Sequence, residues 1–289
     1  MKKLFCICAA LYACFTLNAQ MKPQTFDLWP QGKMPGAVAN APEKSEYSKD
    51  WQFTIVSNVS KPTLEVFRAK TKGPTGFVLI CPGGSYEILA YDLEGTEIAQ
   101  KLAESGISAG VLKYRVPDNR EGALMDAQRA IRLVRANAKK WKVDPGKICV
   151  MGFSAGGHLA ATASTIGAFK PAFSILFYPV ITAEPGKGHQ LSFDSLLGTD
   201  RTAEQSEYYS LQNRVTEATP PTLLLHSDDD TGVPAVNSAL YYEALKAHGV
   251  KASMHIYPTG EHGWGFHTNF PYHEVWKAAV LEWLREVNR

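Results

Sequence analysis

One serine of this chain lies between two glycines, in a spacing that could support chemistry. The stretch is Gly152-Phe153-Ser154-Ala155-Gly156. Residues 147–150 before it are apolar and β-prone, and residues 159–163 after it are small and compatible with a helix. A strand-to-helix turn of this kind strains the serine backbone and lifts the hydroxyl out of the sheet. The first helix amides then point at the space above the hydroxyl, where an oxyanion could be held. The pattern predicts a nucleophilic serine, Ser154.

A serine hydroxyl is a weak nucleophile, so it needs a base and a carboxylate that orients that base. His262 is our candidate for the base, because a histidine titrates near neutral pH and this one follows the strand expected at 252–257. His267 is a rival on the same loop, but His262 is flanked by a glycine and stands closer to the strand. The candidate acids are Asp228, Asp229 and Asp230, which follow the strand expected at 222–226.

Two other histidines near these segments are expected to be structural. His158 sits on the helix of the nucleophile, and His226 ends a buried strand. In the reaction that this constellation would support, water resolves an acyl-enzyme. No metal or organic cofactor is required, and the cysteine and histidine spacing does not suggest zinc.

The glycine-rich stretch Pro82-Gly83-Gly84-Ser85-Tyr86 follows a near-continuous apolar strand at 76–81. Glycines at this position allow the backbone to approach a ligand closely. The amides of the stretch could therefore form the second part of an oxyanion hole, although an ordinary strand-to-helix turn explains the pattern equally well.

The elements that must position these residues alternate along the chain. Apolar strand patterns are followed by helical ones, which predicts an α/β fold with a mainly parallel sheet and helices on both faces. In such sheets the ligand site lies beyond the carboxyl ends of the strands, so Ser154, the three acids and His262 should gather at one edge. The strands are expected at 51–56, 63–70, 76–81, 107–114, 147–150, 173–178, 222–226 and 252–257, and the main helices at 94–105, 122–138, 236–247 and 274–287.

Two segments do not follow this alternation. Residues 21–50 are polar and contain four prolines, so they should form an extended arm and no helix. Residues 180–218 have no clean period and are interpreted as an insertion over the strand ends, with a role either in the substrate pocket or in surface packing.

The N-terminus has the composition of a secretory signal peptide: Lys2 and Lys3, a short apolar run, and Ala19 at the expected cleavage site. This predicts a signal peptide at 1–19, a single domain at 20–289, and a secreted or periplasmic protein. Lipidation at Cys14 is an alternative, although Tyr12 fits a lipobox poorly. The apolar run is too short to cross the hydrocarbon core of a bilayer as a regular helix.

The remaining chain has 28 basic and 28 acidic residues, so it carries no electrostatic signature of nucleic-acid or anionic-membrane binding. Its two cysteines, Cys81 and Cys149, lie in apolar runs and are expected to be buried. A disulfide between them would be compatible with export, but sequence alone does not supply the geometry.

Several stretches together resemble the α/β-hydrolase carboxylesterases of the hormone-sensitive-lipase-like and prolyl-oligopeptidase-like kind. The resemblance is strongest to bacterial secreted esterases of the acetyl xylan esterase type, and it covers nearly all of residues 26–287. The stretches are Leu28-Trp29-Pro30-Gln31-Gly32, Cys81-Pro82-Gly83-Gly84-Ser85-Tyr86, Leu112-Lys113-Tyr114-Arg115, Asp126-Ala127-Gln128-Arg129-Ala130, Gly152-Phe153-Ser154-Ala155-Gly156-Gly157-His158, His226-Ser227-Asp228-Asp229-Asp230 and Glu261-His262-Gly263.

The resemblance implies roles for individual positions. Ser154 would be the nucleophile, His262 the base and Asp230 the acid, with Ala155 and either Gly84 or Ser85 supplying the oxyanion amides. Ser85 stands where many members of the family have a third glycine. The choice between the last two amides therefore stays open, because a residue with a side chain disfavours positive φ.

The resulting hypothesis is a secreted carboxylesterase that removes small acyl groups, acetyl groups in the first place, from plant polysaccharide or oligosaccharide. The alternatives are a short-peptide serine peptidase of the same fold and a non-catalytic binding module. Tyr86 and the 180–218 insertion are expected to crowd the acyl side of Ser154 and favour acetyl over longer chains. The acyl group, the sugar and the oligomeric state are not defined by the sequence.

Overall fold

The computed structural model describes residues 22–36, 41–117 and 119–287. The expected signal peptide at 1–19 and the alternative lipidation site at Cys14 lie outside the described residues. Within the described residues, no helix has the length and apolar character needed to cross a bilayer.

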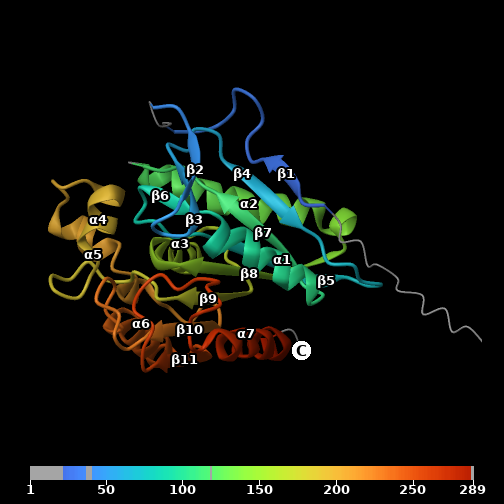
Figure 1. Ribbon diagram of the computed structural model, residues 1–289. Helices are drawn as coiled ribbons and strands as arrows, with labels where there is room; N and C mark the ends of the chain where they lie inside the picture. The colour runs from blue at the N-terminus through green and yellow to red at the C-terminus, as the bar shows by residue number, and fades with distance from the viewer. Residues whose placement is uncertain (1–21, 37–40, 118, 288–289) are drawn as a thin grey trace, which may run out of the picture.

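An eight-stranded sheet forms the centre of the molecule (Figure 1). Its first three strands in spatial order pair antiparallel, and every later neighbour pairs parallel, as expected for an α/β fold. The strands, in spatial order, are β1 (Gln24–Asp27), β4 (Thr63–Phe67), β7 (Ser108–Lys113), β5 (Thr75–Cys81), β8 (Val143–Phe153), β9 (Phe173–Phe177), β10 (Thr222–Ser227) and β11 (Ala252–Tyr257).

Helices cover both faces of this sheet, because successive side chains of its central strands point to opposite sides. Leu79 and Val150 pack with α2 (Arg120–Trp141), α3 (Ser154–Thr165) and α6 (Val236–Ala247). Their neighbours Ile80 and Met151 pack on the other face, with α1 (Glu97–Glu104) and α7 (His273–Val287).

The two cysteines follow the same alternation. Cys81 belongs to the core on the α2–α3 side, and Cys149 belongs to the core on the α1–α7 side. Both thiols are buried and free. The disulfide considered from the sequence is therefore not formed.

A three-stranded antiparallel sheet lies beside the segment that follows β5. It consists of the hairpin β2 (Lys44–Ser48) and β3 (Phe53–Ser57), with β6 (Ile88–Ala90) paired to β3. A π-helical turn, η1 (Asp92–Thr96), then leads into α1. The polar arm predicted for residues 21–50 thus contains two short strands, β1 and β2, which its prolines and charged residues did not indicate.

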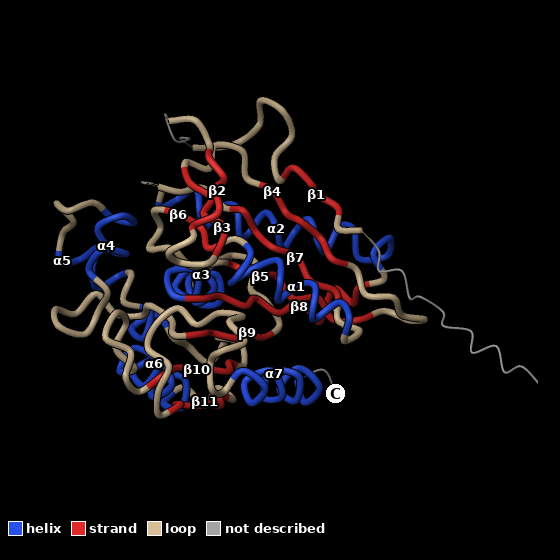
Figure 2. The backbone as a smooth tube through the Cα atoms, viewed as in Figure 1, coloured by secondary structure: helices blue, strands red, loops and turns tan. Residues whose placement is uncertain are grey.

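The 180–218 insertion is also more ordered than expected. It contains α4 (Gln190–Leu197), α5 (Ala203–Tyr208) and the 3₁₀ turn η2 (Leu211–Arg214). Figure 2 shows α4 and α5 at one side of the molecule. None of these helices exceeds eight residues. Each is too short to display the repeating apolar pattern by which helices are found in a sequence.

Candidate active site

Ser154 lies at the turn between β8 and α3, where the sequence predicts a nucleophile. β8 ends at Phe153, α3 begins at Ser154, and the serine has a positive φ of 51°. Gly156 comes so close to β5 that a Cβ there would overlap the carbonyl oxygens of Cys81 and Pro82. The glycine is therefore required by the close approach of α3 to this strand, and the strained serine is held by its surroundings.

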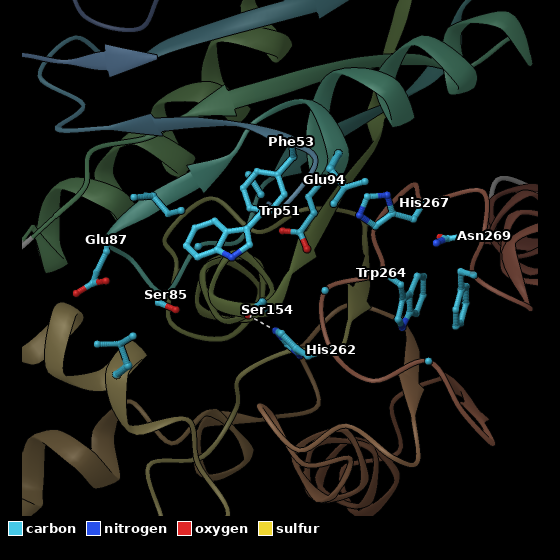
Figure 3. A pocket seen from close by; sticks show the side chains of 18 of the residues that line it. Trp51, Phe53, Ser85, Glu87, Glu94, Ser154, His262, Trp264, His267 and Asn269 are labelled. Atoms are coloured by element: carbon cyan, nitrogen blue, oxygen red, sulfur yellow. Dashed lines mark hydrogen bonds between the residues drawn. The ribbon is translucent and has the colours of Figure 1, made fainter. Parts of the chain in front are cut away.

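The three side chains expected to act together form a continuous hydrogen-bonded chain (Figure 3 shows its Ser154–His262 part). His262 Nε2 is 2.9 Å from Ser154 Oγ, and His262 Nδ1 is 2.7 Å from Asp230 Oδ2. An Nδ1–H that donates to the carboxylate leaves Nε2 free to accept the serine proton. The arrangement is that of a nucleophile, a base and an orienting acid.

Asp230 is held as a carboxylate by four donors. Oδ1 accepts from the backbone amides of Gly232 (3.0 Å) and Val233 (2.7 Å), and Oδ2 accepts from His262 and lies 3.2 Å from His226 Nε2. Burial by itself raises the pKa of Asp230. The hydrogen bonds from both histidines and the Val233 amide outweigh burial, so the net effect is a pKa well below the usual range. His226, predicted to be a core histidine, is buried and helps to hold the acid.

The rival residues occupy other positions. Asp229 accepts hydrogen bonds from the amides of Gly260 (3.2 Å) and Glu261 (2.8 Å), so it anchors the loop that carries His262. Asp228 is exposed. His267 lines the cavity above the serine, but the ring that reaches Ser154 Oγ is that of His262.

The glycine-rich segment after β5 bends next to the serine. Gly84 has a φ of 129°, and a Cβ there would overlap the Ile88 carbonyl, so this position requires glycine. Ser85 and Tyr86 also have positive φ values, 58° and 60°, despite their side chains. Among the described residues, no acceptor is bonded to the amides of Gly84 or Ser85. Both amides are available to an oxyanion, as is that of Ala155 in the first turn of α3.

Glu94 is a member of the site that the sequence reasoning missed. Its side chain is buried, lines the cavity, and accepts hydrogen bonds from the Gly83 amide (2.7 Å) and the Tyr178 hydroxyl (2.7 Å). The Tyr178 ring in turn packs edge-on against His262, with centroids 4.8 Å apart. Burial raises the pKa of Glu94, although these two hydrogen bonds and the charge of His262 lower it in part. Glu94 therefore connects the glycine-rich segment to the base.

Tyr86 does not occupy the pocket wall, where we expected it. Its ring is buried against Tyr114, and its hydroxyl donates to His158 Nδ1 at 2.9 Å. His158 Nε2 donates to the Tyr209 carbonyl at 2.9 Å, and burial lowers the His158 pKa to about 4. His158 is thus a neutral structural residue that connects the glycine-rich segment to the 180–218 insertion.

An open cavity of about 730 Å³ lies over Ser154 and His262. The side chains of Trp51, Phe53 and Glu87 belong to its lining, as Figure 3 shows. The 180–218 insertion contributes only Leu191 to that lining. The expectation that the insertion crowds the serine is therefore wrong. The described residues contain no cluster of side chains suited to holding a metal ion.

The fold and the triad define a class: this is a serine hydrolase with the α/β-hydrolase fold. A family model described as the prolyl oligopeptidase family matches residues 121–288, and a second model, BD-FAE, matches residues 64–173. The chain belongs to the prolyl oligopeptidase family, and it is similar to esterases of the acetylxylan type.

Three relatives illustrate this similarity. An acetylxylan esterase of Xylanibacter ruminicola is 37% identical over 75% of this chain and 47% of its own length. Endo-1,4-beta-xylanase B of Butyrivibrio fibrisolvens is 34% identical over 76% of this chain and 36% of its own length. The match thus spans less than half of either protein. A crystal structure of an acetyl ester-xyloside bifunctional hydrolase from Caldicellulosiruptor lactoaceticus superposes with a TM-score of 0.80 at 31% identity, covering 94% of this chain and 98% of that one.

Proposed function

We propose that this protein is a carboxylesterase that removes small acyl groups, acetyl above all, from neutral plant polysaccharide or its oligosaccharides. The observation that carries the proposal is the hydrogen-bonded chain Ser154–His262–Asp230 beneath an open cavity. The printed names of the relatives, an acetylxylan esterase and an acetyl ester-xyloside hydrolase, support the choice of ester.

In the proposed reaction, Ser154 Oγ attacks the ester carbonyl while His262 Nε2 takes its proton. The tetrahedral oxyanion is held by the amides of Ala155 and of Gly84 or Ser85. The imidazolium then protonates the departing sugar hydroxyl, which leaves an acetyl group on Ser154. Water, deprotonated by His262, releases acetate and restores the serine. Asp230 stabilises the imidazolium in both halves of the reaction.

The charge of the cavity favours a neutral substrate. Glu87 and Glu94 lie in its lining, and none of the described residues that line it is a lysine or arginine. A xylan or chitin backbone carries no carboxylate, whereas a pectin backbone carries one on each uronic acid and would be repelled. Acetylated xylo-oligosaccharides should therefore be better substrates than acetylated pectin fragments.

Acyl-chain length needs a direct test, because neither Tyr86 nor the bulk of the insertion narrows the cavity. We expect kcat/KM for p-nitrophenyl esters to be highest for acetate and to fall sharply by butyrate. This expectation rests on the printed names of the relatives, an acetylxylan esterase and an acetyl ester-xyloside hydrolase, because no narrowing of the cavity supports it. Rates that rise from acetate through octanoate would show a lipase-like site and contradict the acetyl assignment while leaving the triad intact.

Export is part of this proposal. Residues 1–19 have the composition of a signal peptide, and a polymeric substrate outside the cell is accessible only to an exported enzyme. N-terminal sequencing of the protein recovered from culture medium or periplasm would test this directly. Mature protein beginning at Gln20 is expected.

The deciding experiment measures acetate release from acetylated xylan, pectin and chitin oligomers under identical conditions. Preferential release from xylan supports the proposal. A second candidate, peptidase activity, is suggested by the match to the prolyl oligopeptidase model. Cleavage of a p-nitroanilide dipeptide faster than p-nitrophenyl acetate would favour it. A binding module without catalysis would turn over neither compound.

A further inference from the structure

We propose that Trp51 and Phe53 form an aromatic platform on which a pyranose ring of the substrate stacks beside Ser154. This inference rests on the proposed function. It adds a subsite for the carbohydrate part of the ester, next to the site where the acyl group reacts.

The first observation is the exposure of a large aromatic side chain inside the cavity. Trp51 is 57% exposed and lines the same cavity as Ser154 and His262. Its indole stacks on Phe53, with ring centroids 5.7 Å apart and an interplanar angle of 27°. In Figure 3 the indole lies between Phe53 and Ser154. An exposed apolar surface in a binding cavity is characteristic of ligand contact.

The second observation is that the platform is attached to the catalytic machinery. Thr54 follows Phe53 in β3 and donates to the Asp92 carboxylate through its amide (2.7 Å) and its hydroxyl (2.6 Å). Asp92 lies two residues before Glu94. β3 also pairs with β6, which directly follows the glycine-rich segment. The platform is therefore held in position relative to the oxyanion amides, as a specific subsite requires.

The chemistry of the platform indicates its ligand. An aromatic face carries negative potential and attracts the positive edges of C–H groups. A pyranose with equatorial substituents presents C–H groups on both faces and hydroxyls around its rim. Glu87, exposed at the same cavity, offers a carboxylate that can accept hydrogen bonds from such hydroxyls. A β-linked xylose chain satisfies both requirements, whereas a fatty acyl chain would leave the carboxylate unused.

The test compares Trp51→Ala, Trp51→Phe and a matched control, Tyr47→Ala. Tyr47 lies on β2 of the same hairpin and is 61% exposed, but it is not among the residues that line the cavity. Two quantities are measured: kcat/KM for mono-acetylated xylotetraose relative to that for p-nitrophenyl acetate, and the Kd of unmodified xylotetraose by calorimetry in a Ser154→Ala background.

For Trp51→Ala we expect the ratio of the two kcat/KM values to fall about tenfold, mainly because the KM for acetylated xylotetraose rises. The Kd of unmodified xylotetraose should rise by a similar factor. Trp51→Phe should recover most of both quantities, because it restores an aromatic face. Tyr47→Ala should have the same kcat/KM ratio and the same Kd as the protein without a substitution in the hairpin.

Other outcomes separate this inference from the proposed function. An unchanged ratio of kcat/KM values and an unchanged Kd in Trp51→Ala would overturn the platform. The platform would also be overturned if xylotetraose did not bind to the Ser154→Ala protein that keeps Trp51. If xylotetraose binds through Trp51 but its acetylated form releases no acetate, the platform stands and the proposed esterase function fails.

Discussion

The carboxylate of Glu94 accepts a hydrogen bond from the backbone amide of Gly83 at 2.7 Å. This bond fixes the start of the segment whose Gly84 and Ser85 amides are the proposed oxyanion donors. The other carboxylate oxygen accepts from Tyr178, whose hydroxyl also accepts from the Gly265 amide at 2.9 Å. One buried side chain thus connects the oxyanion segment to the loop that follows His262.

Replacement of Glu94 should impair the chemical step more than substrate binding. Glu94→Gln keeps the shape but has only one acceptor oxygen for two donors, and we expect kcat to fall roughly tenfold with little change in KM. Glu94→Ala should fall further. Steady-state kinetics on p-nitrophenyl acetate measure both values.

The pH profile distinguishes a role for the Glu94 charge from a purely steric one. Because burial raises the Glu94 pKa, this carboxyl takes up its proton at a higher pH than an ordinary glutamate as the solution is acidified. Any loss of activity from that protonation should be absent from the Gln variant. Glu104→Gln, an exposed position on α1, serves as the control. Wild-type kcat in Glu94→Gln would contradict the positioning role.

The three consecutive aspartates should differ sharply in their effect on turnover. Asp230→Asn would leave His262 in the wrong tautomer, and a loss of about 10⁴ in kcat is the scale for this change in a serine protease triad. Asp229→Asn weakens only the anchoring of the histidine loop and should stay within about tenfold of wild type. Asp228→Asn, exposed, should have the smallest effect. Equal losses at the three positions, or the largest at Asp228, would refute the assignment of Asp230.

His158 should make the fold sensitive to acid. Its pKa is about 4 in the folded protein, against an ordinary value of 6.5, so the unfolded chain binds more protons between these two pH values. The contribution of His158 to the free energy of unfolding is fully present above pH 6.5 and is lost as the pH falls toward 4. Over that window the loss amounts to about 3 kcal/mol.

Urea unfolding at pH 7 and pH 4.5 measures this effect. The decrease in unfolding free energy between the two pH values should be smaller in His158→Gln than in wild type by about 2 kcal/mol. His248→Gln, at an exposed position after α6, should show the wild-type decrease. A His158→Gln decrease as large as that of wild type would mean that other groups cause the acid sensitivity.

The sequence indicated the parts of the site that depend on local pattern. Ser154 was found because the turn, its glycines and the flanking elements are contiguous. His262 and the acids were found because the strands before them are recognisable and end at one edge of a parallel sheet. The residues alone did not decide which of the three aspartates is the acid, since the direction of each side chain depends on how the loop after β10 turns.

The parts that were missed depend on contacts between distant segments. Glu94 meets Gly83 and Tyr178 only after β5, η1 and β9 are assembled, and Trp51 reaches the cavity only because β3 pairs with β6. Tyr86 was misplaced for the same reason: its proximity in sequence to Gly84 suggested the pocket, whereas a positive φ turns its ring toward His158. No spacing in the sequence encodes these contacts.

The most direct test of the central claim is the turnover of p-nitrophenyl acetate and acetylated xylo-oligosaccharide by Ser154→Ala, with its folding checked by circular dichroism and urea unfolding. The account predicts a folded protein whose kcat for both esters is lower by roughly 10⁵–10⁶, the scale found when a subtilisin nucleophile is removed. A folded Ser154→Ala protein that keeps a substantial fraction of wild-type turnover on either ester would contradict it.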